Sequence, residues 1–192
     1  NLVDINEQSK RATKITQSLL RQANPHVQQL TLTNINDLVQ ANLDIVSYSK
    51  QVEKKEFSLN IETEYDLRIG EQFIMAGDLN QIIVNLLNNA CDAVFEKKER
   101  VGSQFEPTIF VTTNLLENHW IEITIIDNGD GIAPEIAEHI FEPFNTSKEP
   151  GKGTGLGLYL IYDLAKQNQW KVNWSREDEK TQFVLKFPIN LS

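Results

Sequence analysis

The chain has 192 residues, of which 40% are hydrophobic and 23% charged, so it is not disordered as a whole and has room for one large domain with a short attached segment. Its formal net charge of -9 argues against nucleic acid and against an anionic membrane surface as partners, because both attract clustered positive charge. The single cysteine, Cys91, excludes an intramolecular disulfide and a multi-cysteine metal site, and it fits a reducing, cytoplasmic setting.

The first segment, residues 1–23, has the pattern of a helix that ends at Asn24-Pro25, because the residue before a proline avoids the helical conformation. The apolar positions of this helix, at mostly three- and four-residue steps, are Leu2, Ile5, Ala12, Ile15 and Leu19. This stripe suits packing on the domain that follows or one half of a coiled coil or helical hairpin, and periodicity does not separate the two. No signal peptide and no apolar run of about 20 residues is present. Since the first residue is Asn, we expect a piece of a longer chain.

The rest of the chain mixes helical and strand patterns. Helices are predicted at about 35–54, 78–100 and 158–168, with a short one opening at Pro134. Strands are predicted around 57–61, 73–76, 107–116, 119–127, 170–175 and 181–187. Neighbouring strands joined by short turns predict an α+β fold, a two-layer α/β sandwich with helices on one face of a mixed sheet.

The long helix at 78–100 carries polar residues opposite its apolar face. Asn85, Asn89 and Asp92 share that polar side, at i, i+4 and i+7. Such a stripe is most often a solvated surface. The alternative is the wall of a cleft, in which amide oxygens bind Mg²⁺ together with the phosphate oxygens of a nucleotide.

The strand at 119–127 ends in Asp127, followed by Gly129 and Gly131. One interpretation is a tight turn, since Asn-Gly and Asp-Gly pairs are common in turns. The other is the floor of a pocket. An ionised carboxylate only accepts hydrogen bonds, so Asp127 facing the exocyclic amine of adenine would select adenine over guanine. Glycines there would let the base approach the backbone closely.

A glycine-rich loop at 151–157 precedes the helix at 158–168. Unpaired N–H groups and the positive end of a helix dipole favour a phosphate at such a place, although a glycine-rich loop alone is equally a flexible linker.

The preceding segment, Phe141-Glu142-Pro143-Phe144, leads into Thr146, Ser147 and Lys148. These residues offer hydroxyls and a positive charge to phosphate oxygens, or they form an ordinary solvated loop.

Together and in this order, the four elements resemble a known family, the ATP-binding catalytic domain of bacterial sensor histidine kinases. That domain belongs to an ATPase superfamily shared with DNA gyrase, heat-shock chaperones and mismatch-repair proteins. The family's N box is matched by Asn85–Ala93, its G1 box by Asp127–Ile132, its F box by Phe141–Phe144 and its G2 box by Gly153–Leu158. The resemblance covers about residues 30–190.

The resemblance implies ATP and Mg²⁺ as cofactors. Asp127 would bind the adenine amine with help from Thr181, and Asn89, with Asn85 nearby, would coordinate Mg²⁺. The residues implied for ATP binding are Asn85, Asn89, Asp92, Asp127, Gly129, Gly131, Ile132, Phe144, Thr146, Ser147, Lys148, Gly153, Thr154, Gly155, Leu156, Gly157 and Thr181. Part of this set, around 144–154, would close over the phosphates as an ATP lid.

The family's phosphoacceptor motif is absent, because none of His26, His119 and His139 has its flanking residues. Residues 1–24 instead resemble the second helix of the dimerisation hairpin, and 25–192 the catalytic domain. The acceptor histidine would therefore lie outside this chain, in the dimerisation and phosphoacceptor domain of the full-length protein. A response regulator receiver domain is the further partner implied, and the N-terminal helix could form a homodimer.

Three alternatives stay open at this point. Hydrolytic relatives have Glu where Asn85 stands, and a neutral amide cannot act as the base that activates water. Transfer to an external histidine therefore fits better than a hydrolytic ATPase. A non-catalytic nucleotide-sensing module and a plain interaction domain without nucleotide are the other two.

Overall fold

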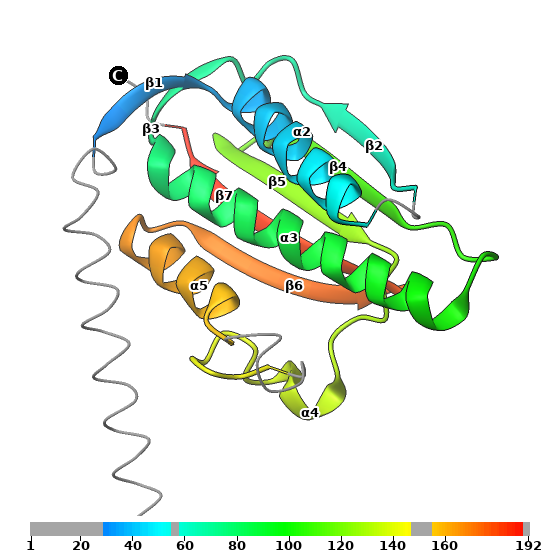
Figure 1. Cartoon of the computed structure of the whole chain (residues 1–192). Helices are drawn as coiled ribbons and strands as arrows, with labels where there is room; N and C mark the ends of the chain where they lie inside the picture. Colours follow the sequence, from blue (N-terminus) through cyan, green and yellow to red (C-terminus); the bar gives the residue numbers. More distant parts are fainter. Residues whose placement is uncertain (1–28, 55–57, 147–154, 190–192) are drawn as a thin grey trace, which may run out of the picture.

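The computed structural model describes residues 29–54, 58–146 and 155–189, so the N-terminal helix predicted for 1–23 lies outside the described residues. The elements are β1 (Leu30–Asn34), α2 (Ile35–Glu53), β2 (Asn60–Tyr65), β3 (Glu71–Met75), α3 (Ala76–Val101), β4 (Thr108–Leu115), β5 (Trp120–Asp127), α4 (Pro134–Ala137), α5 (Gly157–Gln167), β6 (Lys171–Glu177) and β7 (Lys180–Pro188). A five-stranded sheet has the order β2-β4-β5-β7-β6, and β1 and β3 form a separate two-stranded sheet. The α+β prediction is confirmed: α2, α3 and α5 lie together on one face of the larger sheet, here called the helix face (Figure 1).

The larger sheet is mixed because β2 pairs with β4 in parallel while every other pairing is antiparallel. Alternate residues of its central strands are buried on the helix face. These are Ile109, Val111 and Thr113 of β4, Ile121, Ile123, Ile125 and Asp127 of β5, and Thr181, Phe183, Leu185 and Phe187 of β7. This period of two gives an almost wholly apolar core face and an outer face in which polar and apolar residues are mixed. Asp127 and Thr181 are the polar members at one end of this apolar set.

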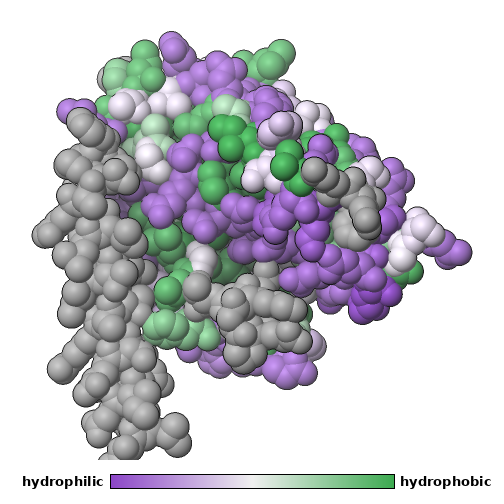
Figure 2. Space-filling model, in the orientation of Figure 1, coloured by the Kyte–Doolittle hydropathy of each residue, from purple (hydrophilic) through white to green (hydrophobic). Residues whose placement is uncertain are grey.

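Helix α3 crosses the middle of the helix face and contacts both α2 and α5. Its buried positions recur at three- and four-residue steps: Leu79, Ile82, Ile83, Leu86, Leu87, Ala90, Cys91, Val94 and Phe95. Full burial of each large aliphatic side chain contributes about 1.5–3 kcal/mol. The opposite side is polar, and a band of hydrophilic residues follows α3 on the molecular surface (Figure 2).

Strand β1 is an element that the sequence analysis did not predict. Its residues alternate leucine and threonine, and its last residue, Asn34, caps α2 by accepting hydrogen bonds from the backbone N–H groups of Asn36 and Asp37. The strand predicted around 57–61 is also displaced. It begins at Asn60 and runs to Tyr65, and Phe57 lies outside the described residues. The other elements start and end within about two residues of their predicted positions.

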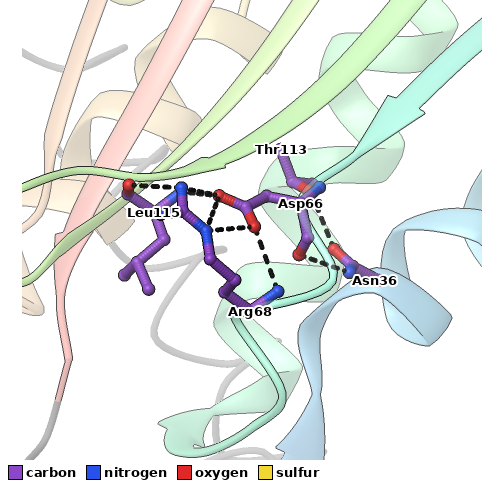
Figure 3. Close-up of polar contacts among 5 residues, drawn as sticks. All are labelled: Asn36, Asp66, Arg68, Thr113 and Leu115. Atoms are coloured by element: carbon purple, nitrogen blue, oxygen red, sulfur yellow. Dashed lines mark hydrogen bonds and ion pairs between the residues drawn. The ribbon is translucent and has the colours of Figure 1, made fainter.

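A polar cluster fastens α2 and the end of β2 to β4 (Figure 3). The Thr113 hydroxyl donates to Asn36 Oδ1 at 2.7 Å and accepts from the Asp66 amide at 3.1 Å. The Asp66 carboxylate accepts from the Leu115 amide and from the guanidinium of Arg68. The hydrogen bond from Arg68 holds the pKa of Asp66 well below its usual range.

Among the described residues, no helix is both long and apolar enough to span a membrane.

Candidate functional site

Asp127 is the last residue of β5, and its side chain is only 4% exposed although it carries a carboxylate. Its Oδ1 accepts a hydrogen bond of 2.9 Å from the Gly129 amide. Burial raises the pKa of Asp127 to about 6, against the opposing effects of that amide and of the charges of Lys97 and Arg176. A buried carboxylate with a shifted pKa is a common feature of functional sites.

Thr181 of β7 lies directly opposite Asp127 in the antiparallel register and is 3% exposed. Its Oγ1 is buried and has no hydrogen-bond partner within the part of the chain that the structure describes. The buried Thr113 differs, since its hydroxyl both donates and accepts. A buried hydroxyl without a partner lowers the free energy of unfolding by about 1–3 kcal/mol. A ligand or a water molecule that bonds to Thr181 and Asp127 would remove this loss.

The loop after Asp127 is fixed against α3 by charged side chains. Lys97 Nζ donates to the carbonyl oxygens of Asn128 and Gly129, at 2.8 and 3.3 Å, and lies 4.8 Å from the centre of the Phe105 ring. Arg100 forms an ion pair with Asp130. A Cβ on Gly129 would lie 2.7 Å from Ala93 Cβ, so only glycine lets this loop approach the helix so closely.

Glycine is favoured at position 131 by its backbone conformation. Its φ of +82° lies in the left-handed region, and an added Cβ would lie 2.5 Å from Nη1 of Arg176. The guanidinium of Arg176, from β6, therefore lies against the backbone of this loop. Ile132, the next residue, is partly buried against the hydrophobic core.

The polar row of α3 is half-buried rather than fully solvated. Asn85 Nδ2 donates to the Gln81 carbonyl at 2.8 Å, and a Cβ on Gly157 would lie 3.7 Å from Asn85 Oδ1. The first turn of α5 therefore lies beside Asn85. Asp92 accepts a 2.8 Å hydrogen bond from Lys50 of α2, and this bond, against the opposing effect of burial, raises the pKa of Lys50.

The asparagine oxygens of this row are suitable ligands for a hard cation such as Mg²⁺. The start of α5 beside Asn85 favours the phosphate oxygens that such an ion also binds. Asn85 uses its amide nitrogen for the helix backbone, so its oxygen is the atom that faces the first turn of α5. Asn89 is one helical turn further along the same side and is half-buried.

The segment after α4 joins the start of α5 through Phe144 and Gly155. The Phe144 amide donates to the Gly155 carbonyl at 2.9 Å, and both residues have positive φ. Phe144 is 42% exposed, whereas Phe141 is half-buried and stacks on Tyr162 with ring centres 5.3 Å apart. The two phenylalanines therefore differ in their environment, although the sequence analysis assigned both to the same segment, Phe141–Phe144.

The predicted site residues form two groups along α3. The structure brings together Asp127, Gly129, Gly131 and Thr181 at one place, and Asn85, Gly155 and Gly157 at another along α3. Thr146 and Leu156 are half-buried beside this second group in sequence, and each has an interaction partner. Ser147, Lys148, Gly153 and Thr154 lie outside the described residues, so the predicted lid is not described.

Three functional candidates escaped the sequence analysis: Lys50, Lys97 and Arg176. Lys97 belongs to the charged end of α3, and such a charged segment is typical of a solvated surface. Its partner Asn128 is 31 positions away in the sequence, so no local pattern indicates the contact. Arg176 had a usable signal, because the alternation of β6 places it on the same face as Trp174 and Val172. Lys50 is placed only by the packing of α2 on α3.

Residues 76–191 match the model of the family described as histidine kinase-, DNA gyrase B- and HSP90-like ATPases. The two-component sensor PprA of Pseudomonas aeruginosa is 38% identical over 114 residues, which are 59% of this chain and 12% of that protein. The sensor histidine kinase ZraS of Salmonella typhimurium is 30% identical over 186 residues, 95% of this chain and 36% of ZraS. The chain thus spans a minor part of the curated relatives it matches.

Solved structures have the same fold. Full-length ShkA in complex with AMPPNP superposes with a TM-score of 0.69 at 21% identity, over 85% of this chain and 32% of ShkA. The nucleotide-free catalytic domain of the histidine kinase ThkA gives a TM-score of 0.67 at 22% identity, over 84% of this chain and 96% of that domain.

Proposed function

Because this chain belongs to the family of histidine kinase-, DNA gyrase B- and HSP90-like ATPases, we propose that it transfers the γ-phosphoryl group of ATP to a histidine of the longer protein to which it belongs. It is a histidine kinase-type ATPase domain of the kind carried by two-component sensor kinases. The observation that supports its nucleotide site best is the buried Thr181 hydroxyl beside Asp127, which has no hydrogen-bond partner among the described residues.

Adenine fits the Asp127–Thr181 pair by its hydrogen-bonding groups. The exocyclic amine donates to the Asp127 carboxylate, and Thr181 Oγ1 bonds to the base or to a water molecule beside it. Guanine presents a carbonyl where adenine has the amine, and this carbonyl would face a buried carboxylate. Such a contact leaves two acceptors opposed, so guanine is rejected.

The phosphates would lie along α3 toward the start of α5. When bound, Mg²⁺ neutralises phosphate charge, and Asn89 and Asn85 would hold it by their amide oxygens. The first turn of α5, with Leu156 and Gly157, offers N–H groups and a positive dipole end to phosphate oxygens. Thr146, Phe144 and Gly155 would border the phosphates, and Asp92, which is bonded to Lys50, would stabilise the asparagine-bearing part of α3. Ser147, Lys148, Gly153 and Thr154 complete the lid in this proposal.

Transfer fits these residues better than hydrolysis. Phosphoryl transfer depends mainly on positioning and charge stabilisation. The amide of Asn85 cannot accept a proton from an attacking water, and its nitrogen is already bonded to the helix backbone. A hydrolytic ATPase of the same superfamily is the alternative, and a turnover far above background would favour it.

The remaining parts of the proposal concern the longer protein. Its dimerisation and phosphoacceptor domain would present the histidine, and a response regulator receiver domain would take the phosphoryl group. Residues 1–24 would belong to the dimerisation hairpin and 25–192 to the catalytic domain, working in the cytoplasm.

Two threonine variants test the nucleotide site. Thr181→Val removes a hydroxyl without changing the volume, so we expect ATP affinity to fall about tenfold, for a loss of about 1–2 kcal/mol, with no loss of thermal stability. Thr113→Val is the matched control, since its hydroxyl is bonded to Asn36 and Asp66. That variant should lose stability and keep its nucleotide affinity. Unchanged ATP affinity in Thr181→Val would contradict the site.

The transfer step needs the longer protein. Incubated with ATP labelled at the γ-phosphate, it should gain label that is stable in base and lost in acid, as a phosphohistidine is. Rapid release of inorganic phosphate without labelled protein would favour the hydrolytic alternative.

A further inference from the structure

A row of three side chains crosses one end of the helix face. Asp127 of β5 is the register partner of Thr181 in β7, and Thr181 is the register partner of Arg176 in β6. Partners in antiparallel strands point to the same side of a sheet. Arg176 therefore shares its side with the two residues assigned to adenine, at the exposed edge of the sheet.

Arg176 is exposed, and its guanidinium lies against the Gly131 loop. A Cβ built on Gly131 would lie 2.5 Å from Nη1, 2.7 Å from Cζ and 3.0 Å from Nε of Arg176. Three atoms of the planar group at such similar distances mean that it lies flat on the Gly131 backbone. Arg176 thus brings a positive charge from the edge strand to the loop that follows Asp127.

Charged groups reach Asp127 from two directions. Lys97 from α3 and Arg176 from β6 both stabilise its ionised form. The other titratable groups of α3 near this end have partners or are neutral. Asp92 is paired with Lys50, and burial raises the pKa of Cys91 to about 12, which keeps the thiol uncharged.

The remaining elements around Asp127 add little charge. Asp130 of the following loop is paired with Arg100. The register partners of Asp127 on the two neighbouring strands, Ile109 of β4 and Thr181 of β7, are uncharged. The charges that act on Asp127 are therefore those of Lys97, from α3, and Arg176, from β6.

We propose that Arg176 is a positioning residue for adenine recognition, which holds the Gly131 loop and supplies a positive charge that stabilises the acceptor form of Asp127. This inference rests on the proposed function, since it assigns a second layer to the same adenine site. Arg176 acts here through Asp127, and no contact with the phosphates is required of it.

The test measures how adenosine affinity depends on pH between about 5 and 8. Adenosine is the probe because it lacks phosphates, whose own second pKa near 6 would obscure that of the protein. Affinity should fall as the pH drops through the pKa of Asp127, because the protonated carboxyl presents an O–H donor and a weaker acceptor to the adenine amine. The 192-residue chain is compared with Arg176→Gln, Arg176→Lys and Lys171→Gln.

In Arg176→Gln the midpoint of this fall should move upward by about half a pH unit, which is about a twofold loss of affinity near pH 6 and about a threefold loss well below it. Arg176→Lys keeps the charge, so its midpoint should stay near that of the unmodified chain. Lys171→Gln removes the same charge from the other face of β6, and it should leave the midpoint unchanged. The carbon-13 shift of the Asp127 carboxyl, followed without ligand, should give the same order.

An unmoved midpoint in Arg176→Gln, or an equal loss of affinity at every pH, would overturn the inference and leave Arg176 a structural residue. If adenosine fails to bind the unmodified chain, the proposed function itself fails. The two failures are therefore distinguishable.

Discussion

Phe144 and Gly155 are joined by a 2.9 Å hydrogen bond from the Phe144 amide to the Gly155 carbonyl, although ten residues lie between them. A Cβ on Gly155 would lie 2.5 Å from the carbonyl carbon of Phe144 and 2.9 Å from the amide nitrogen of Asn145. These are backbone atoms, so no change of side-chain rotamer can relieve the clash. The close approach of the two chain segments at the entry to α5 therefore depends on glycine.

Gly155→Ala should lower both stability and ATP affinity. Residue 155 has a φ of +63°, and Gly70, with a φ of +59°, has open space around it. Gly70→Ala is therefore a matched control that carries the backbone strain alone, about 1 kcal/mol. Thermal unfolding of both variants should show a further loss of about 1–3 kcal/mol in stability for Gly155→Ala. ATP titration should show weaker binding for Gly155→Ala than for Gly70→Ala. Equal effects of the two variants would mean that the contact with Phe144 is not needed.

Asp127→Asn should make the nucleotide-free chain more stable at pH 7. Burial raises the pKa of Asp127 from 3.8 to about 6, so the folded chain binds this proton more tightly than the unfolded chain. The stability from this group is present in acid and is lost as the pH rises from about 4 to about 6. Two pKa units correspond to about 3 kcal/mol, which is the upper limit of the expected gain. Urea unfolding between pH 4 and 8 measures it, and a variant that is less stable at pH 7 would contradict the prediction.

Lys50 and Asp92 should be coupled more strongly than Lys54 and Glu99, although both pairs join α2 to α3. The first pair has side chains 19% and 30% exposed, against 38% and 48% for the second. Solvent screens the more exposed pair. Double-mutant cycles combine Lys→Met with Asp→Asn in the first pair and with Glu→Gln in the second. The coupling free energy should be about 1 kcal/mol for Lys50–Asp92 and less than about half of that for Lys54–Glu99. The reverse order would show that exposure does not decide the coupling.

Asn89→Ala should weaken ATP binding in the presence of Mg²⁺ more than in its absence. The amide oxygen is lost as a ligand, while the contacts of adenine are unchanged. Asn88→Ala is the neighbouring control, because Asn88 donates to the Val84 carbonyl of its own helix. We expect a tenfold or larger loss of magnesium-dependent affinity for Asn89→Ala only. If the magnesium dependence stays the same in Asn89→Ala, the metal role is wrong.

Local pattern was sufficient for most of the fold. The period of α3 and the alternation in β4, β5 and β7 are strong because each element has one buried face. Asp127 was predicted as a site residue because a strand that ends in an acid and two glycines is a local signal. Strand β1 was missed because only its pairing with β3, about 40 residues away, identifies it as a strand.

The residues that support the site could not be found in this way. Lys97 and Arg176 reach the Asp127 loop from positions 30 and 49 residues away from Asp127, and neither has a motif of its own. The lack of a hydrogen-bond partner for the Thr181 hydroxyl, in the part of the chain that the structure describes, is likewise a property of packing. A sequence shows which groups are available, whereas the fold decides which of them are satisfied.

The most direct measurement is a calorimetric comparison of ATP and GTP, each with Mg²⁺, on the unmodified chain and on Asp127→Asn. A carboxylate that accepts from the adenine amine predicts at least tenfold tighter binding of ATP than of GTP, with most of that preference lost in Asp127→Asn. Equal binding of the two nucleotides, or an ATP preference that survives the substitution, would contradict the assignment of Asp127 to adenine.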